Sequence, residues 1–266
     1  MISSISKAFK KAREEKRPAL LTYTVAGDST KKISLEILKS LSKHVDICEV
    51  GFPHNTPIAD GGQIQTSAYR AIKNGFKIND LFNIVKNYKK IKYSKPIILM
   101  GYYNMIYQQG EESFLNKCKK AGVNGIIVVD LPWPENIKFS KKCKKRNISF
   151  VQLISPTTEY IRAKKIIKDS HEMIYYISML STTGGKLKVS PKEILSKYNK
   201  IKKINPKKIC VIGFGITLKS IGKLKSADGL VVGSAICKEI SSSLAKRQNP
   251  VTNVVKTVVK LRNKIA

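Results

Sequence analysis

The sequence predicts a single-domain (β/α)8 barrel of the TIM type, and three observations support this fold class. Eight short runs rich in Val, Ile and Leu recur along the chain. They are continuously apolar, as expected for parallel strands that are buried on both faces. Segments with helical spacing of apolar residues separate them, and 266 residues suit one barrel over the range 1–266. An open, doubly wound sheet is the alternative.

The predicted strands and helices alternate in chain order. Residues 2–16 are predicted to form an extra N-terminal helix that caps the bottom of the barrel. We expect each strand to be followed by a helix, with apolar helix faces near residues 33–41, 78–85, 114–118 and 161–167. The expected strands are residues 19–25, 45–50, 96–100, 125–129, 148–154, 173–177, 208–212 and 229–232.

Charge is the most unusual feature of the composition. Lys and Arg number 50 against 18 Asp and Glu, a net charge of +32 that could indicate a polyanionic partner. Only seven of the 50 are Arg, although nucleic-acid surfaces favour Arg for bidentate contacts, and the Lys residues are spread over the whole chain. We interpret this balance as the codon bias of an AT-rich genome and expect no specific nucleic-acid partner.

Cysteine, histidine and apolar patterns argue against several other classes. The five Cys are widely and irregularly spaced without a CxxC, and the three His form no ligand pair, so we expect no metal site and no disulfide framework. No run approaches the roughly 20 apolar residues of a membrane helix, and the N-terminus lacks the pattern of an export signal. We therefore expect a cytoplasmic protein with no membrane partner.

Glycines follow the seventh and eighth predicted strands, where barrels commonly bind phosphate. Gly213 and Gly215 form one turn, and Gly233 with Ser234 opens a helix. Backbone N–H groups at such turns present fixed donors to an anion. We predict a phosphate site here, which Gly184 of the sixth loop could close from a third side. Ordinary tight turns are the alternative.

Two carboxylates are predicted near the same end of the barrel. Glu49 ends the second run, where burial would raise its pKa toward that of a working acid or base. Asp60 lies on the following loop, so the two acids could divide these roles. The alternatives are that Glu49 pairs with a buried Lys and that Asp60 caps the helix starting at Gly62. Aromatic rings at strand ends could hold a flat apolar ligand or fill the core: Tyr23, Tyr102, Tyr175 and Phe214.

Several motifs in order along nearly the whole chain resemble the tryptophan synthase alpha chain family. They are CEVGFP at 48–53, PIADG at 57–61, LMGYYN at 99–104, SPTT at 155–158, GFGI at 213–216 and GSA at 233–235. The resemblance implies a lyase that splits indole-3-glycerol phosphate into indole and glyceraldehyde 3-phosphate by retro-aldol cleavage, without a metal or organic cofactor.

The resemblance also implies roles for individual residues. Glu49 would act as the acid and then the base, Asp60 would accept from the indole N–H, and Tyr175 would orient Glu49 or the substrate. The implied indole pocket and substrate contacts are Tyr23, Met100, Tyr102, Ile127, Leu153, Thr183 and Phe214. The implied phosphate ligands are Gly184, Gly213, Gly215, Gly233 and Ser234.

Members of the family work with a beta chain that carries pyridoxal phosphate, so an α2β2 heterotetramer is implied. The sequence departs from the family pattern in two loops. Thr56 stands where Asp is usual, and Ser181 stands where Gly is usual, three residues before Gly184. Both changes affect loops that could cover the site, so coupling to a beta chain is in doubt while the chemistry at Glu49 and Asp60 is untouched.

Two rival functions remain to be weighed. A barrel that makes a neighbouring intermediate of indole or tryptophan biosynthesis would need a catalytic Lys at a strand end, and none of the eight runs ends in one. A non-catalytic basic barrel that binds RNA or membranes would not need Glu49 and Asp60. The lyase is therefore the preferred prediction.

Overall fold

The computed structural model describes residues 2–178 and 189–266, and its centre is a parallel sheet. The strands lie in the order β5-β4-β3-β2-β1-β9-β8-β7-β6. The first strand, β1, pairs with β2 on one side and with β9, the last strand, on the other. A doubly wound sheet would instead reverse its order at an internal switch point. The strands are β1 Ala19–Val25, β2 Ile47–Gly51, β3 Ile97–Gly101, β4 Gly125–Val128, β5 Ser149–Phe150, β6 Gln152–Ile154, β7 Met173–Ile177, β8 Ile209–Gly213 and β9 Gly229–Val232.

The barrel prediction is confirmed, with one refinement at the seam. β5 and β6 belong to the single predicted run 148–154, which is interrupted at Val151. β5 pairs with β4 and β6 pairs with β7, so this one run joins the two ends of the sheet. The eight runs of the sequence therefore correspond to the nine strands of the barrel.

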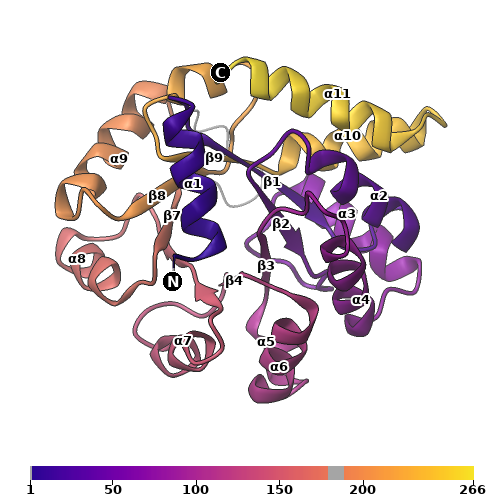
Figure 1. Cartoon of the computed structure of the whole chain (residues 1–266), viewed down its shortest axis with the longest axis horizontal. Coiled ribbons are helices and arrows are strands. Elements are labelled where there is room, and N and C mark those ends of the chain that lie inside the picture. The colour runs from indigo at the N-terminus through magenta and orange to yellow at the C-terminus, as the bar shows by residue number, and fades with distance from the viewer. Residues whose placement is uncertain (1, 179–188) are drawn as a thin grey trace.

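Helices surround the strands, as Figure 1 shows. The prediction that every strand is followed by an α-helix is wrong after β8, because the described chain there forms a short 3-10 helix, η1, at Ile221–Leu224. The α-helices are α1 Ser4–Glu14, α2 Lys31–Leu41, α3 Gly62–Lys73, α4 Ile78–Lys89, α5 Tyr103–Tyr107, α6 Glu111–Ala121, α7 Ile137–Lys144, α8 Tyr160–Asp169, α9 Pro191–Ile204, α10 Ser234–Ala245 and α11 Pro250–Asn263.

The alternation of side chains along each strand separates two apolar cores. Leu20, Cys48 and Val50 belong to the core between the strands and the surrounding helices. Leu21 and Ile47 belong to the core inside the barrel. Because Glu49 follows Ile47 by two residues on β2, its side chain also points into the barrel.

Helix α1 closes the amino-terminal end of the barrel, as the sequence predicts. Ile5, Phe9 and Ala12 are buried within the interior core. A Cβ at Gly229 would lie 2.9 Å from the ring of Phe9, so the helix and β9 are in close contact. In Figure 1, α1 lies across the strands. The opposite end of the barrel, where the strands finish, is left for the site.

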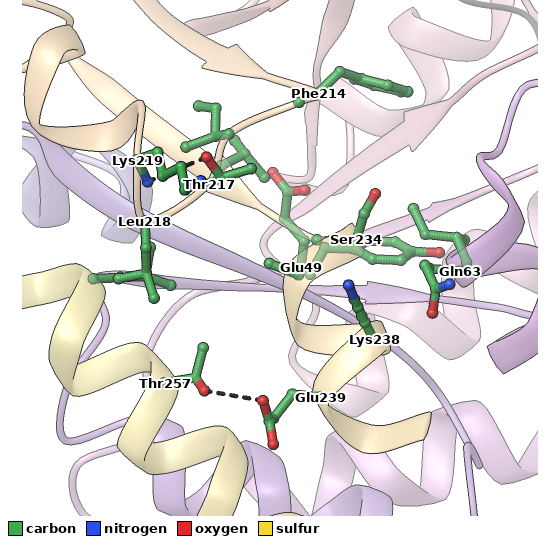
Figure 2. A pocket seen from close by; sticks show the side chains of 18 of the residues that line it. Glu49, Gln63, Phe214, Thr217, Leu218, Lys219, Ser234, Lys238, Glu239 and Thr257 are labelled. Atoms are coloured by element: carbon green, nitrogen blue, oxygen red, sulfur yellow. Dashed lines mark hydrogen bonds between the residues drawn. The ribbon is translucent and has the colours of Figure 1, made fainter. Parts of the chain in front are cut away.

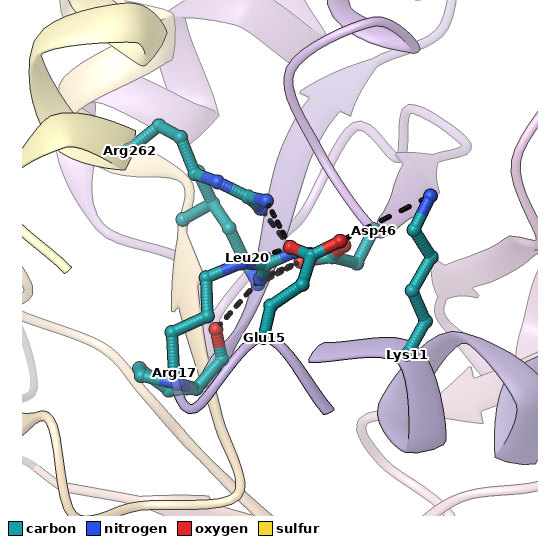
Figure 3. A network of polar contacts seen from close by, with 7 residues as sticks. Lys11, Glu15, Arg17, Leu20, Asp46 and Arg262 are labelled. Carbon is teal, nitrogen blue, oxygen red and sulfur yellow. Dashed lines mark hydrogen bonds and ion pairs between the residues drawn. The ribbon is translucent and has the colours of Figure 1, made fainter. Parts of the chain in front are cut away.

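A partly buried ionic network stabilises this closed end (Figure 3). The Asp46 carboxylate accepts hydrogen bonds from Arg17 Nη1 at 2.6 Å, Arg17 Nη2 at 2.9 Å and the Leu20 backbone N–H at 2.8 Å. Arg262 of α11 donates to it at 3.1 Å. Glu15 accepts from both guanidinium groups. The network therefore ties together the segments that enter β1 and β2 and the end of the last helix.

Candidate active site

Glu49 is a fully buried carboxyl group inside the barrel. It lies in register between Tyr23 of β1 and Ile98 of β3. Neither of its oxygens has a hydrogen-bond partner among the described residues, so the alternative of a buried Lys partner is wrong for that part of the chain. Burial alone raises the pKa of Glu49 to about 8. The group therefore holds a proton near neutral pH and can lose it when the surroundings change.

Asp60 is the second buried acid, on the loop between β2 and α3. One of its oxygens, Oδ2, accepts from the Tyr102 hydroxyl at 3.2 Å, and Oδ1 has no partner among the described residues. Burial raises the pKa of Asp60 to about 6, against the opposing effect of the Tyr102 hydrogen bond. Asp60 is thus mainly ionised at neutral pH, whereas Glu49 is mainly neutral.

Helix α3 does not use Asp60 as its cap. The residue in the N-cap position is Gly61, and no side chain there accepts a hydrogen bond. The capping alternative for Asp60 is therefore wrong. Tyr102 instead holds the loop, because its hydroxyl also accepts from the Ala59 backbone N–H at 3.0 Å while it donates to Asp60. The ring of His54 lies against Tyr102, with 5.0 Å between the ring centroids.

Tyr175 lies beside both acids in the interior. Its pKa is raised well above the usual range, first by burial and then by the charges of Glu49 and Asp60. A Cβ on Gly213 would lie 1.8 Å from the Tyr175 hydroxyl, so the ring fits only because residue 213 is Gly. Tyr175 also meets Phe214 edge to face, with centroids 6.2 Å apart. The tyrosine hydroxyl is therefore fixed, protonated and close to the acids.

Glu49 and Tyr175 line a cavity of about 560 Å³ (Figure 2), whereas Asp60 and Tyr102 are not among its lining residues. Eight of the predicted site residues line it: Tyr23, Glu49, Met100, Tyr175, Phe214, Gly215, Gly233 and Ser234. A smaller hollow of about 80 Å³ shares Met100, Tyr175 and Phe214 with the cavity. Ile127 and Leu153 line that hollow together with Ala59, the neighbour of Asp60.

Three predicted ligands are not found among the described residues that line the cavity. Thr183 and Gly184 are outside the described residues. Gly213 does not line the cavity; its carbonyl oxygen accepts from the backbone and the hydroxyl of Ser178, at 3.0 and 2.8 Å. The structure thus gives Gly213 a packing role, the close approach of Tyr175 described above.

Helix α10 presents free backbone donors to the cavity. The N–H groups of Ile236 and Cys237 both donate to the Gly233 carbonyl, which closes the first turn. No side chain caps the helix, and the N–H groups of Ser234 and Ala235 find no partner among the described residues. Across the cavity, Gly215 adopts a left-handed conformation with φ +68°. Free N–H groups at a helix N-terminus suit an anion.

Comparison with known proteins decides the family. A family model described as tryptophan synthase alpha chain matches residues 9–266. A tryptophan synthase alpha chain from Pelagibacter ubique (strain HTCC1062) is 73% identical, covering 100% of both chains. The chain belongs to the tryptophan synthase alpha chain family. It is therefore a carbon–carbon lyase of tryptophan biosynthesis that cleaves indole-3-glycerol phosphate.

Solved structures agree with this assignment. The tryptophan synthase alpha subunit from Legionella pneumophila str. Paris is similar with a TM-score of 0.91 and 29% identity, covering 100% of this chain and 99% of that one. A chain of the tryptophan synthase complex from Pyrococcus furiosus gives a TM-score of 0.80 at 34% identity, covering 92% and 98%. The alpha-chain barrel predicted from the motifs is confirmed.

Sequence reasoning missed the outer half of the cavity. Thr217 to Lys219 after β8 and Lys238 of α10 line this outer half, and Gln63 and Ile64 of α3, also missed, line the same cavity. Lys238 could have been found from helical spacing, because it follows Ser234 by four residues and therefore lies on the same face of the helix. Across residues 2–178 and 189–266, no helix is long and apolar enough to cross a membrane, and no group of three potential ligand side chains could hold a metal ion.

Proposed function

We propose that Glu49 is the acid and base of a retro-aldol cleavage. Indole is a poor leaving group until its C3 atom is protonated, so the neutral carboxyl of Glu49 first donates its proton there. The resulting carboxylate then accepts the proton of the glycerol hydroxyl as the bond between C3 and the adjacent carbon breaks. The products are indole and glyceraldehyde 3-phosphate. The buried, unpartnered carboxyl of Glu49 at the cavity wall is the observation that supports this proposal.

Asp60 supplies the charge that this reaction needs. Protonation of C3 places positive charge on the indole nitrogen, and an ionised Asp60 would accept the N–H and stabilise that charge. Its free oxygen Oδ1 has the capacity to do so. Tyr175, fixed beside both acids, would orient Glu49 or the substrate. The different pKa values of the two acids suit these different roles.

The cavity accommodates the two ends of the substrate separately. The apolar walls contributed by Tyr23, Met100 and Phe214, continued by Ile127 and Leu153, suit the flat indole ring. Tyr102 contributes by holding the Asp60 loop. The phosphate would bind the free N–H groups at Ser234, with Gly215 and Gly233 beside them. Gly184, Thr183 and Gly213 are the remaining ligands that the family resemblance implies.

A tryptophan synthase beta chain is the proposed partner, in an α2β2 assembly. The similar chain from Pyrococcus furiosus is part of a tryptophan synthase complex, which supports this proposal. Pyridoxal phosphate would belong to the beta chain, and the alpha chain would need no cofactor of its own. Thr56 is exposed on the loop that carries Asp60, where the family usually has Asp. A biosynthetic role of this kind also supports a cytoplasmic location, and the one continuous sheet supports a chain that folds as one domain.

Indole release from indole-3-glycerol phosphate tests the proposal. We expect slow release by the purified chain alone and a sharp rise when a tryptophan synthase beta chain is added. A rate unchanged by the beta chain would contradict the coupling and leave a lyase that works alone. Absence of indole under both conditions would overturn the catalytic assignment.

A further inference from the structure

The cavity extends past the proposed phosphate position into an outer half that no step of the reaction uses. Its inner half is lined by Tyr23, Glu49 and Met100, whereas its outer half lies between α10, α11 and the segment after β8. Two cations line this outer half, Lys219 and Lys238. The phosphate group of the substrate is a dianion near neutral pH. A cation at the phosphate end of the cavity would therefore make the substrate bind more tightly.

Of the two lysines, Lys238 is the one that lies close to the proposed phosphate position at Ser234. It follows Ser234 by four residues on α10, a rise of about 6 Å along the helix. Side chains on a helix tilt toward its N-terminus, which directs the long Lys238 side chain back toward Ser234. Figure 2 shows this direction, and in the same view the ammonium group of Lys219 lies on the other side of the cavity, beside Thr217.

No acidic partner neutralises Lys238 among the described residues, since the ion pairs found there do not include it. Residues 179–188 contain no Asp or Glu that could serve instead. Glu239, the neighbour of Lys238, accepts from Thr257 of α11 at 3.4 Å and from Ser243 at 3.5 Å. Lys238 therefore lines the cavity as an exposed cation with no ion-pair partner among the described residues.

This placement opposes the electrostatics of the helix itself. A helix N-terminus carries partial positive charge, so a cation within reach of it is unfavourable until an anion binds. Helix α10 has no acidic residue in its first turn and no side-chain cap. A phosphate at Ser234 would satisfy the free N–H groups and pair with the lysine at once.

We propose that Lys238 is a specificity-determining residue that attracts and holds the phosphate of indole-3-glycerol phosphate at the N-terminus of α10. This inference rests on the proposed function, in which Gly233 and Ser234 receive the phosphate. Lys238 acts on substrate binding and leaves the chemical step to Glu49 and Asp60.

Steady-state cleavage by Lys238→Met tests the role, with Lys246→Met, at the far end of the same helix, as the matched control. We expect the KM for indole-3-glycerol phosphate to rise roughly tenfold in Lys238→Met while kcat stays within about twofold. Added salt should raise the KM of the parent chain more steeply than that of this variant, because screening weakens the same attraction. Inhibition by inorganic phosphate should weaken in parallel, and Lys238→Arg should restore most of the affinity.

The outcomes separate this inference from the proposed function. If the parent chain cleaves the substrate and Lys238→Met keeps its KM and salt dependence, the role of Lys238 is overturned and the lyase stands. If Lys246→Met raises KM equally, the overall charge of the protein is responsible and the specific role is again overturned. A melting temperature for Lys238→Met at or above that of the parent excludes misfolding, and we expect this result because a cation near the helix N-terminus is removed.

Discussion

Two buried carboxylates three residues apart behave in opposite ways. Asp46 precedes β2 at the closed end of the barrel and accepts four hydrogen bonds, three of them from Arg17 and Arg262. Glu49, inside the barrel on β2, accepts none from the described residues. The paired acid fastens the fold, and the unpaired acid keeps a proton that it can transfer. The segment 46–51 therefore contributes stability just before β2 and reactivity within it.

Loss of the Asp46 charge should give the largest effect on stability. Asp46→Asn removes the buried charge that Arg17 and Arg262 share and leaves them only the more exposed Glu15, so the cost in unfolding free energy should lie near the lower end of that of breaking a buried pair, about 3 kcal/mol. Urea unfolding measures this change. We expect kcat for indole release to stay unchanged wherever the variant is folded, and a drop in kcat with normal stability would contradict the division between the two acids.

Glu49→Gln should give the opposite result, a large loss of kcat without a loss of stability. The amide keeps the shape of the side chain but can no longer give and take a proton, so kcat should fall at least about a hundredfold with little change in substrate affinity. Single-turnover release of indole measures the chemical step directly. A near-normal rate would remove Glu49 from the proposed role.

The pH dependence of the unfolding free energy, compared between Glu49→Gln and the parent chain, tests whether Glu49 is protonated in the folded state. The pKa of Glu49 is raised from 4.5 to about 8 in the folded chain, so between these values the folded state holds a proton that the unfolded state releases. Stability of the parent chain is therefore lost as pH rises from about 5 toward 8. We expect the variant to gain about 2 to 4 kcal/mol over the parent across this range. A difference that does not change between pH 5 and pH 8 would contradict the raised pKa.

Asp60→Asn should have the smallest effect of the four. Asp60 stabilises charge without transferring a proton, so its loss should lower kcat roughly tenfold, less than the loss of Glu49. The melting temperature should not fall, because Asp60 caps no helix and an ionised buried acid is removed. Full activity with a lowered melting temperature would show that Asp60 only supports its loop.

The strands were predictable where the pattern is local. β1, β7 and β9 match their predicted runs at both ends, because continuous apolar sequence bounded by polar residues is visible in the chain. The break at Val151 was not predictable, because it depends on how the barrel closes between β4 and β7. The 3-10 helix after β8 was missed for a different reason, since apolar spacing in the sequence does not distinguish helix types.

In the site, too, the residues could be predicted where the signal is local, but their long-range contacts could not. Glu49 and the Gly233 turn could be found because strand ends and helix starts are readable in a barrel. The contact between Tyr102 and Asp60 joins residues 42 positions apart, and only the folded chain shows that Asp60 makes this contact and does not act as the helix cap that was its alternative role. Gly213 was assigned to phosphate, yet its lack of a side chain admits Tyr175, a residue from the neighbouring strand.

The pairing of β1 with β9 sets the order in which the protein can be completed during synthesis. Ala19 is in register with Gly229, so the first strand must wait for almost the whole chain before its second edge is covered. At roughly 5 to 20 residues per second, translation leaves that edge open for about 10 to 40 s. Long-range closure of this kind slows folding, and an open apolar edge can pair with another chain. The ribosome-bound chain therefore passes through a period in which one edge of β1, the strand beside Glu49, is open to pairing with another chain.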